Sequence, residues 1–221
     1  MLGKLYIVAT PIGNLNDITI RALETLKQVN FVLCEDTRVS KRLLENYQLL
    51  TSTISYHQHS DDKKVKDIES LLNEGKDLAL ITDAGTPGIS DPGNRLIESL
   101  TINIKDLEII PIPGPSAIIT ALSISGFPTD KFVFLGFPPH KNKRKKYFEE
   151  LKEIKYTVAL YESSHRIKKT LQEILDICGD RKVLVGRELT KKFETIYRGK
   201  ISEILKNIKE KGEFVIVISN H

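Results

Sequence analysis

The chain has 221 residues, of which 40% are hydrophobic and 28% are charged, so it can build one large or two small globular domains. No apolar run approaches the roughly 20 residues that cross a bilayer, and the run Leu5–Ala9 is too short for a signal peptide, which predicts a cytoplasmic protein without membrane contact. Residues 1–115 hold 12 Lys and Arg against 16 Asp and Glu, whereas residues 116–221 hold 21 against 13. The second half therefore carries either a site for an anionic partner or a solvated basic surface.

The first half of the chain alternates short apolar runs with amphipathic segments, the order that is typical of a parallel sheet covered by helices. We expect strands at Lys4–Thr10, Phe31–Glu35, Thr53–Tyr56, Leu78–Thr82 and Leu107–Ile112. Helices are expected between them, at Ile18–Val29 with Asp17 as N-cap, through Arg42–Leu44, from Asp61 or Asp62 to Gly75, and at Asn94–Leu100.

Three prolines between Pro111 and Pro115 mark a domain boundary, because proline interrupts helices and central strands. We therefore expect an N-terminal α/β domain at 1–112 and a C-terminal α/β domain at 113–221. The connections in the second domain are shorter, which predicts a mixed sheet. Its strands are expected at Phe132–Gly136, Tyr156–Tyr161, Lys182–Gly186, Thr195–Tyr197 and Phe214–Ser219, and its helices at Ser116–Ser123, His165–Gly179 and Ile201–Lys209.

Small and polar residues follow four of the strands expected in the first domain. These segments are Thr10–Asn14, Glu35–Arg38, Asp83–Gly93 and Pro113–Ala117. The carboxyl ends of parallel strands form the edge of a sheet where ligands bind, and Gly and Pro either admit a ligand to the backbone or fix an unusual turn. Four such loops at one edge favour a small-molecule site.

The Asp83–Gly93 loop is longer than the two to six residues or so that usually join a strand to a helix. Its first residue, Asp83, can accept a hydrogen bond from a ribose hydroxyl or a ligand ammonium, and the peptide groups after it can bind an adenine edge. Asp91 precedes Pro92, the pattern of an N-cap followed by proline at the first helical position. We therefore expect Asp91 to begin the next helix.

Several other kinds of site are not supported by the sequence. It contains no GxxxxGK[ST], GxGxxG, HExxH or GxSxG motif, and Cys34 and Cys178 do not form a CxxC pair. His57 and His59 would share one face of a strand, but a third ligand is missing nearby, so we expect no metal site.

Seven segments, in order along the chain, are similar to motifs of the tetrapyrrole methylase superfamily: TPIGNL, CEDTR, TDAGTPGISDPG, PGPSA, GFPP, YESSHR and RELTKKFET. Within it, they most resemble the group that methylates the 2′-hydroxyl of a cytidine in 16S ribosomal RNA. The resemblance implies two α/β domains with S-adenosylmethionine (SAM) in the cleft between them, a homodimer, and the small ribosomal subunit as partner. Many members carry a further C-terminal segment of several dozen residues, so that either the RNA contacts of that segment are absent here or the sequence is a piece of a longer protein.

The resemblance also assigns residues to the cofactor. The implied contacts are Pro11, Asp83, Ala84, Gly85 and Thr86 in the first domain, Ser116 and Ala117 between the domains, and Tyr161, Glu162 and Glu188 in the second. Alternatives exist for several of them. Pro11 can merely shape a turn, Ser116 can cap a helix, and the two glutamates can be surface carboxylates.

Methyl transfer to a ribose hydroxyl is helped by a general base, because a protonated hydroxyl is a weak nucleophile. The catalytic candidates are Glu35, Asp36 and Arg38, which follow a strand and are too charged for a core. Arg38 would hold a phosphate or orient a carboxylate. A structural ion pair explains this cluster nearly as well, and Glu162 and Glu188 are further candidates for the base.

Cations cluster in HKNKRKKYFEEL, from His140 to Leu151. We expect RNA phosphates to be bound by Lys141, Lys143, Arg144, Lys145 and Lys146, with His165 and Arg166 as further RNA contacts. Cations in the first turn of a helix oppose its dipole, which disfavours a purely structural role over RNA binding, although a solvated face is an alternative. A tetrapyrrole C-methyltransferase remains the rival enzyme, because its substrates are polyanionic too, and a non-catalytic nucleotide-binding module is a third interpretation.

Overall fold

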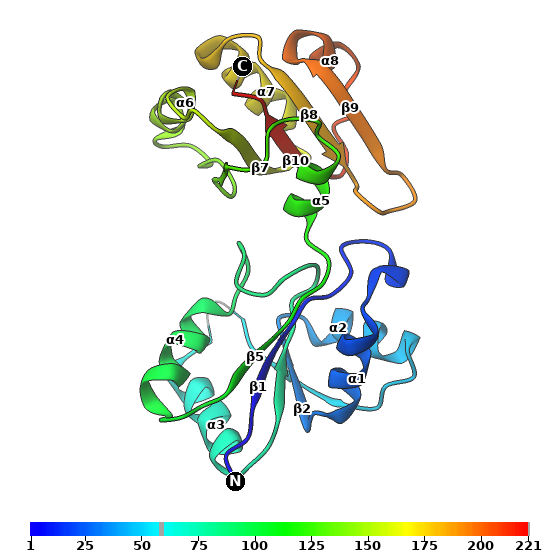
Figure 1. Cartoon of the computed structure of the whole chain (residues 1–221), viewed down its shortest axis with the longest axis vertical. Helices are drawn as coiled ribbons and strands as arrows, with labels where there is room; N and C mark the ends of the chain where they lie inside the picture. The colour runs from blue at the N-terminus through cyan, green and yellow to red at the C-terminus, as the bar shows by residue number, and fades with distance from the viewer. Residues whose placement is uncertain (58–59, 221) are drawn as a thin grey trace. The chain divides into compact units, whose positions relative to one another are not determined.

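The computed structural model describes residues 1–57 and 60–220. The chain forms two compact units, Met1–Ser116 and Ala117–His221 (Figure 1). The division lies four residues beyond the expected boundary between 112 and 113. The loop after the last strand of the first sheet stays packed on that sheet, since a Cβ added to Gly114 would lie 3.1 Å from the Cβ of Ala9.

The first unit contains a five-stranded sheet with the strand order β3-β2-β4-β1-β5. Its strands are β1 (Leu5–Val8), β2 (Phe31–Cys34), β3 (Ser52–Ser55), β4 (Leu78–Leu80) and β5 (Ile109–Ile112). Every neighbouring pair is parallel, as the alternating sequence pattern predicts. Because β2 lies between β3 and β4, the loops that follow these three strands leave the sheet side by side.

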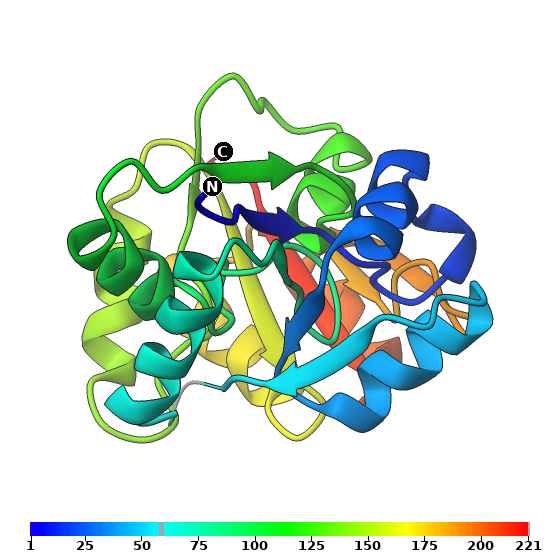
Figure 2. The ribbon, with the colours of Figure 1, turned by 90° about the horizontal axis from the view of Figure 1, so that it is seen from below.

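Helices cover both faces of this sheet. The helices α1 (Ile20–Gln28) and α2 (Thr37–Asn46) lie on one side, and α3 (Asp62–Asn73) and α4 (Asn94–Asn103) lie on the other (Figure 2). Leu26 of α1 packs in the core on the first side, and Ile68 of α3 packs in the core on the second. Burying one apolar stripe of each helix leaves the polar faces in solvent, as expected for α/β units.

Two helix starts differ from the expected ones. Asp17 lies in a 3-10 turn (Leu15–Asp17), and α1 begins at Ile20 because the hydroxyl of Thr19 accepts a hydrogen bond from the backbone N–H of Ala22 at 3.1 Å. The helix α4 follows Gly93, without a side-chain cap. The prediction that Asp91 caps this helix is therefore wrong.

The strand β5 includes Pro111, which pairs in register with Ile7 of β1. A proline has no backbone N–H to donate to a neighbouring strand, so it is found in edge strands and not in the middle of a sheet. Pro111 is tolerated because β5 is the edge strand of the sheet and pairs only with β1.

The second unit contains a mixed sheet with the order β6-β7-β10-β8-β9. Its strands are β6 (Phe132–Phe134), β7 (Thr157–Ser163), β8 (Lys182–Arg187), β9 (Thr195–Lys200) and β10 (Glu213–Ile218). The β6–β7 pair is parallel and the other pairs are antiparallel, which confirms the predicted mixed sheet.

Helices also pack on the second sheet. They are α5 (Ala117–Ser123), α6 (Arg144–Lys152), α7 (Ile167–Cys178) and α8 (Ile201–Asn207). Phe148, Leu171 and Ile204 of the last three share one core with β7, β8 and β10. Among the described helices of both units, none combines the length and the apolar character that crossing a membrane requires.

Candidate functional site

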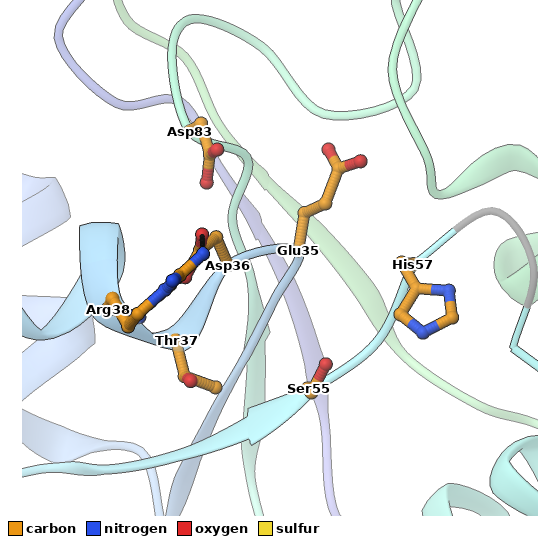
Figure 3. Close-up of a pocket in the computed structure, with 7 residues that line it drawn as sticks. All are labelled: Glu35, Asp36, Thr37, Arg38, Ser55, His57 and Asp83. Carbon is orange, nitrogen blue, oxygen red and sulfur yellow. Dashed lines mark hydrogen bonds and ion pairs between the residues drawn. The ribbon is translucent and has the colours of Figure 1, made fainter.

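A cavity of about 550 Å³ opens at the carboxyl edge of the first sheet. Residues from three adjacent strand ends line it (Figure 3). They are Glu35, Asp36, Thr37 and Arg38 after β2, Ser55 and His57 at and just beyond the end of β3, and Asp83 after β4. The structure therefore places the expected catalytic segment and the expected cofactor residue Asp83 around one cavity.

Sequence reasoning missed two residues of this lining, namely Ser55 and His57, whereas Thr37 lies within the expected segment Glu35–Arg38. Ser55 and His57 reach the cavity because β3 neighbours β2, and the alternation of strands and helices does not reveal strand order. The expected His57–His59 pair falls partly on residues 58 and 59, which lie outside the described residues. In the described part of the chain, no group of three His, Cys, Asp or Glu side chains is arranged to hold a metal ion.

Hydrogen bonds join the loops that follow β1, β4 and β5. Thr10 and Gly85 exchange two backbone hydrogen bonds, with N···O distances of 2.9 and 3.1 Å. The hydroxyl of Thr86 donates to the carbonyl of Pro115 at 3.3 Å. Gly85 has a φ of 86°, which residues with a Cβ rarely adopt. The first-unit residues that the resemblance assigns to the cofactor, Pro11 and 83–86, thus sit at one edge of the sheet on mutually braced loops.

Asp36 and Arg38 form a closed pair at the start of α2. Asp36 caps the helix, because its Oδ1 accepts a hydrogen bond from the backbone N–H of Arg38 at 2.8 Å. The guanidinium of Arg38 donates to both carboxylate oxygens, at 3.1 and 2.7 Å. These hydrogen bonds lower the pKa of Asp36 to about 2. Asp36 is therefore a weak proton acceptor, and its pairing fits the structural alternative stated above.

Two further carboxylates of this edge are shifted in the opposite direction. Desolvation raises the pKa of the Asp83 carboxyl; a backbone hydrogen bond from Asp36 opposes this shift, and the negative charge of the Asp36 side chain adds to it. Burial, with the nearby charges of Glu35 and Asp83, raises the pKa of Asp91 to about 6. Without a capping role, Asp91 contributes charge to this edge. Close carboxylates that disfavour each other's ionisation would be relieved by a cationic ligand.

The second-unit residues assigned to the cofactor occupy different environments. Tyr161, near the end of β7, is half-buried, whereas the Glu162 side chain is buried and accepts hydrogen bonds from the hydroxyl of Thr170 and the backbone N–H of Ser163, at 2.6 and 2.7 Å. Its carboxylate is occupied within the protein, so the structure does not support the prediction of a ligand-facing Glu162. Glu188 lines a separate cavity of about 540 Å³ in this unit.

The basic segment, His140–Leu151, contains both exposed and buried cations. Lys141, Lys143, Lys145 and Lys146 are exposed, and no acidic residue stands in the first turn of α6. Arg144 is only 5% exposed, because its guanidinium is bound by protein acceptors. The expectation that Arg144 contacts RNA is therefore wrong.

The other expected RNA contacts, His165 and Arg166, also differ from each other in exposure. His165 is exposed. Arg166 is largely buried and forms an ion pair with Glu162 at 2.8 Å. The structure accordingly leaves His165 available to a partner and gives Arg166 a partner inside the protein.

Comparison with known proteins matches residues 4–205 to the family described as tetrapyrrole (corrin/porphyrin) methylases. Curated relatives named ribosomal RNA small subunit methyltransferase I include one from Thermotoga maritima, 43% identical over 99% of both chains. Another, from Halalkalibacterium halodurans, is 45% identical over 99% of this chain and 76% of the relative.

A solved structure with a similar fold is that of a cobalamin biosynthetic enzyme, cobalt precorrin-4 methyltransferase. The TM-score is 0.70, and the alignment covers 98% of this chain and 94% of that chain. With 21% sequence identity, the likeness extends to the fold alone.

Proposed function

The chain belongs to the tetrapyrrole methylase family and, within it, to the ribosomal RNA small subunit methyltransferase I group, and we propose that it methylates the ribose 2′-hydroxyl of a cytidine in 16S ribosomal RNA. It is a SAM-dependent methyltransferase. The identity of 43–45% to relatives named for ribosomal RNA favours this function over tetrapyrrole C-methylation. The precorrin methyltransferase shares the fold at less than half that identity.

The observation that carries the proposal is the cavity at the carboxyl edge of the first sheet. Its volume of about 550 Å³ lies within the range of small-molecule sites, roughly 300 to 1,000 Å³. Asp83 and the Glu35–Arg38 segment both line it, together with Ser55 and His57. This arrangement offers separate groups for a donor and for an acceptor.

The residues at this edge fit SAM chemically. SAM carries a sulfonium and an ammonium group, and Glu35, Asp83 and Asp91 form a patch of carboxylates whose mutual repulsion a cation relieves. Ala84 is exposed, whereas Gly85 is buried and both of its backbone groups are hydrogen-bonded to Thr10, so Gly85 sets the shape of the loop that presents Ala84. We assign Pro11, Ala84, Gly85, Thr86, Ser116 and Ala117 to the same site on the family resemblance.

When bound, SAM supplies a methyl group that its sulfonium has already activated. The protein must then align the acceptor oxygen, exclude water and accept a proton, and positioning alone supplies about 7–11 kcal/mol. Glu35 is the candidate base, because it is exposed at the cavity while Asp36 is committed to Arg38. Arg38 lies at the cavity with an exposed side chain and can orient an RNA phosphate.

The second unit is proposed to hold the RNA. Its exposed lysines 141, 143, 145 and 146, together with His165, are the candidate phosphate contacts. Tyr161 and Glu188 are kept as cofactor contacts on the family resemblance. The same resemblance supports a homodimer, and a substrate in the small ribosomal subunit places the protein in the cytoplasm.

Transfer of a labelled methyl group from SAM to small subunits that lack the modification tests this function. The label should map to a cytidine 2′-oxygen of 16S ribosomal RNA. Labelling of a base, or no transfer to subunits under conditions in which SAM binds, contradicts the proposal.

Calorimetry tests the cofactor site in the same preparation. Asp83→Ala should weaken SAM binding by about 1.5–3 kcal/mol, the range for a lost hydrogen bond to a charged group. Asp67→Ala removes an exposed carboxylate of α3 and serves as the matched control. Unchanged SAM affinity in folded Asp83→Ala removes this residue from the site.

A further inference from the structure

Arg144 anchors the chain segment that precedes α6. Its Nη1 donates a hydrogen bond to the carbonyl of Pro139 at 2.7 Å, and its Nε donates to the Glu173 carboxylate at 2.9 Å. Its Nη2 donates to the hydroxyl of Thr170 at 2.8 Å. The side chain of Glu173 comes from α7, which packs beside α6. A cation held by three acceptors inside the protein fixes backbone and does not bind phosphate.

Arg166 holds the neighbouring carbonyl. Its Nη1 donates to Pro138 at 3.0 Å, and its Nη2 pairs with the buried Glu162 at 2.8 Å. The other carboxylate oxygen of Glu162 accepts from the hydroxyl of Thr170 at 2.6 Å. Thr170 therefore links Arg144 to Glu162 and, through Glu162, to Arg166. As a result, one buried polar network binds two successive proline carbonyls. Such fully paired networks hold a single conformation.

The network holds the two residues that directly follow the exposed Phe137. The turn begins at Gly136, with a φ of 64°, whose carbonyl accepts a hydrogen bond from the backbone N–H of Tyr161 at 2.9 Å. Phe137 is 50% exposed, and its ring lies against Tyr161, with the ring centroids 5.3 Å apart. One side of the ring is thus supported by protein while much of it faces solvent.

An aromatic ring held in this way is suited to stacking. Proteins bind single-stranded RNA by placing aromatic rings against bases and cations against phosphates. Exposed Lys141 and Lys143 follow Phe137 within six residues. A ring that already packs against a neighbouring ring loses less conformational freedom when a base stacks on it than an unsupported ring does.

We propose that Phe137 stacks on an unpaired base of the RNA substrate, next to phosphates held by the basic segment. This proposal rests on the proposed function and extends it to base contact. Glu162, Arg144 and Arg166 are positioning residues in this scheme, because they hold the turn and do not touch the RNA.

Binding of unmodified small subunits across a salt series tests the proposal. Phe137→Leu should weaken RNA binding about ten-fold, within the range of one stacked base, and the slope of log affinity against log salt should not change, because no phosphate contact is lost. Phe137→Tyr keeps a stacking ring and should bind like the wild type. Phe132→Leu, at a phenylalanine of β6 that is 39% exposed, is the matched control and should also bind like the wild type.

Each other outcome has a defined meaning. Wild-type RNA affinity in Phe137→Leu overturns the stacking proposal while leaving the methyltransferase function in place. A parallel loss of SAM affinity also overturns it, because the ring then serves the cofactor. If the wild-type protein itself neither binds nor methylates the subunits, the result contradicts the proposed function, and the stacking proposal falls with it. Melting temperatures of all variants confirm that they are folded.

Discussion

At the scale of single residues, the Asp36–Arg38 pair has two tasks that a mutation can separate. Arg38 stabilises the α2 cap through Asp36 and presents an exposed guanidinium at the cavity. We predict that Arg38→Ala lowers the rate of methyl transfer at least ten-fold, because a positioning contact to the acceptor is lost. SAM affinity, measured by calorimetry, should stay within about two-fold of wild type. A parallel fall in both quantities would assign Arg38 to the cofactor or to the fold.

Asp91 is a residue whose charge opposes folding near neutral pH. Its pKa is about 6 in the folded protein, above the ordinary 3.8, because of burial and the charges of Glu35 and Asp83. Above about pH 6 the folded state must carry this unfavourable charge, whereas below about pH 4 both states are protonated. We predict that Asp91→Asn stabilises the SAM-free protein at pH 7 by about 1 kcal/mol, after allowance for solvent screening.

The gain from Asp91→Asn should shrink as the pH falls from about 6 to about 4, which urea titrations at a series of pH values measure. Asp67→Asn, on the exposed face of α3, provides the control. A gain that does not depend on pH would mean that the carboxyl is not the origin of the effect.

At the scale of elements, the connection from β4 to α4 depends on the backbone of Gly93. This residue has a φ of 142°, and a Cβ there would lie 3.1 Å from the Cδ2 of the buried Leu80. The side-chain Nδ2 of Asn94, the first residue of α4, donates a hydrogen bond to the backbone carbonyl of Gly88 at 3.0 Å and closes the loop. The long loop therefore begins at a ligand-facing edge and ends as a tight, glycine-dependent helix start.

We predict that Gly93→Ala destabilises the protein by about 2 kcal/mol or more, since strained backbone and a contact with Leu80 combine. Gly126→Ala is the matched control, because Gly126 also has a positive φ of 73° but no atom within 4 Å of the added Cβ. It should cost only about 1 kcal/mol. Equal losses in thermal or urea unfolding would show that packing against Leu80 has no part in the effect.

At the scale of the whole molecule, the two units divide the charge. The carboxylates of the cavity lie in the first unit, and the basic segment lies in the second. We predict that Lys143, Lys145 and Lys146, all replaced by alanine, reduce the slope of log RNA affinity against log salt by about two units. SAM affinity should not change.

Exposed Lys27, Lys63 and Lys66 of the first unit, replaced together, are the charge-matched control for that measurement. If both triple variants change the slope equally, the effect comes from net charge and not from a phosphate site. If neither changes it, the basic segment is a solvated surface.

The amino-acid pattern determined much of this protein without tertiary information. Alternating apolar runs and amphipathic segments predicted the parallel first sheet, and the shorter connections predicted the mixed second one. Glycines and prolines after the strands marked the functional edge, and ordered motifs such as CEDTR and RELTK indicated the family. These features are local in the chain, or follow from backbone rules that hold for every α/β protein.

Only the tertiary structure decided which residues meet. The strand order placed Ser55 and His57 around the same cavity as Asp83, and packing between α6 and α7 turned Arg144 from an expected phosphate contact into a buried anchor. Asp91 resembled a helix cap in sequence, yet the helix α4 begins after Gly93. The Asp91 carboxylate therefore lies uncommitted near the charges of Glu35 and Asp83. Burial and partner choice depend on residues far apart in the chain, and a single sequence carries no local record of those distances.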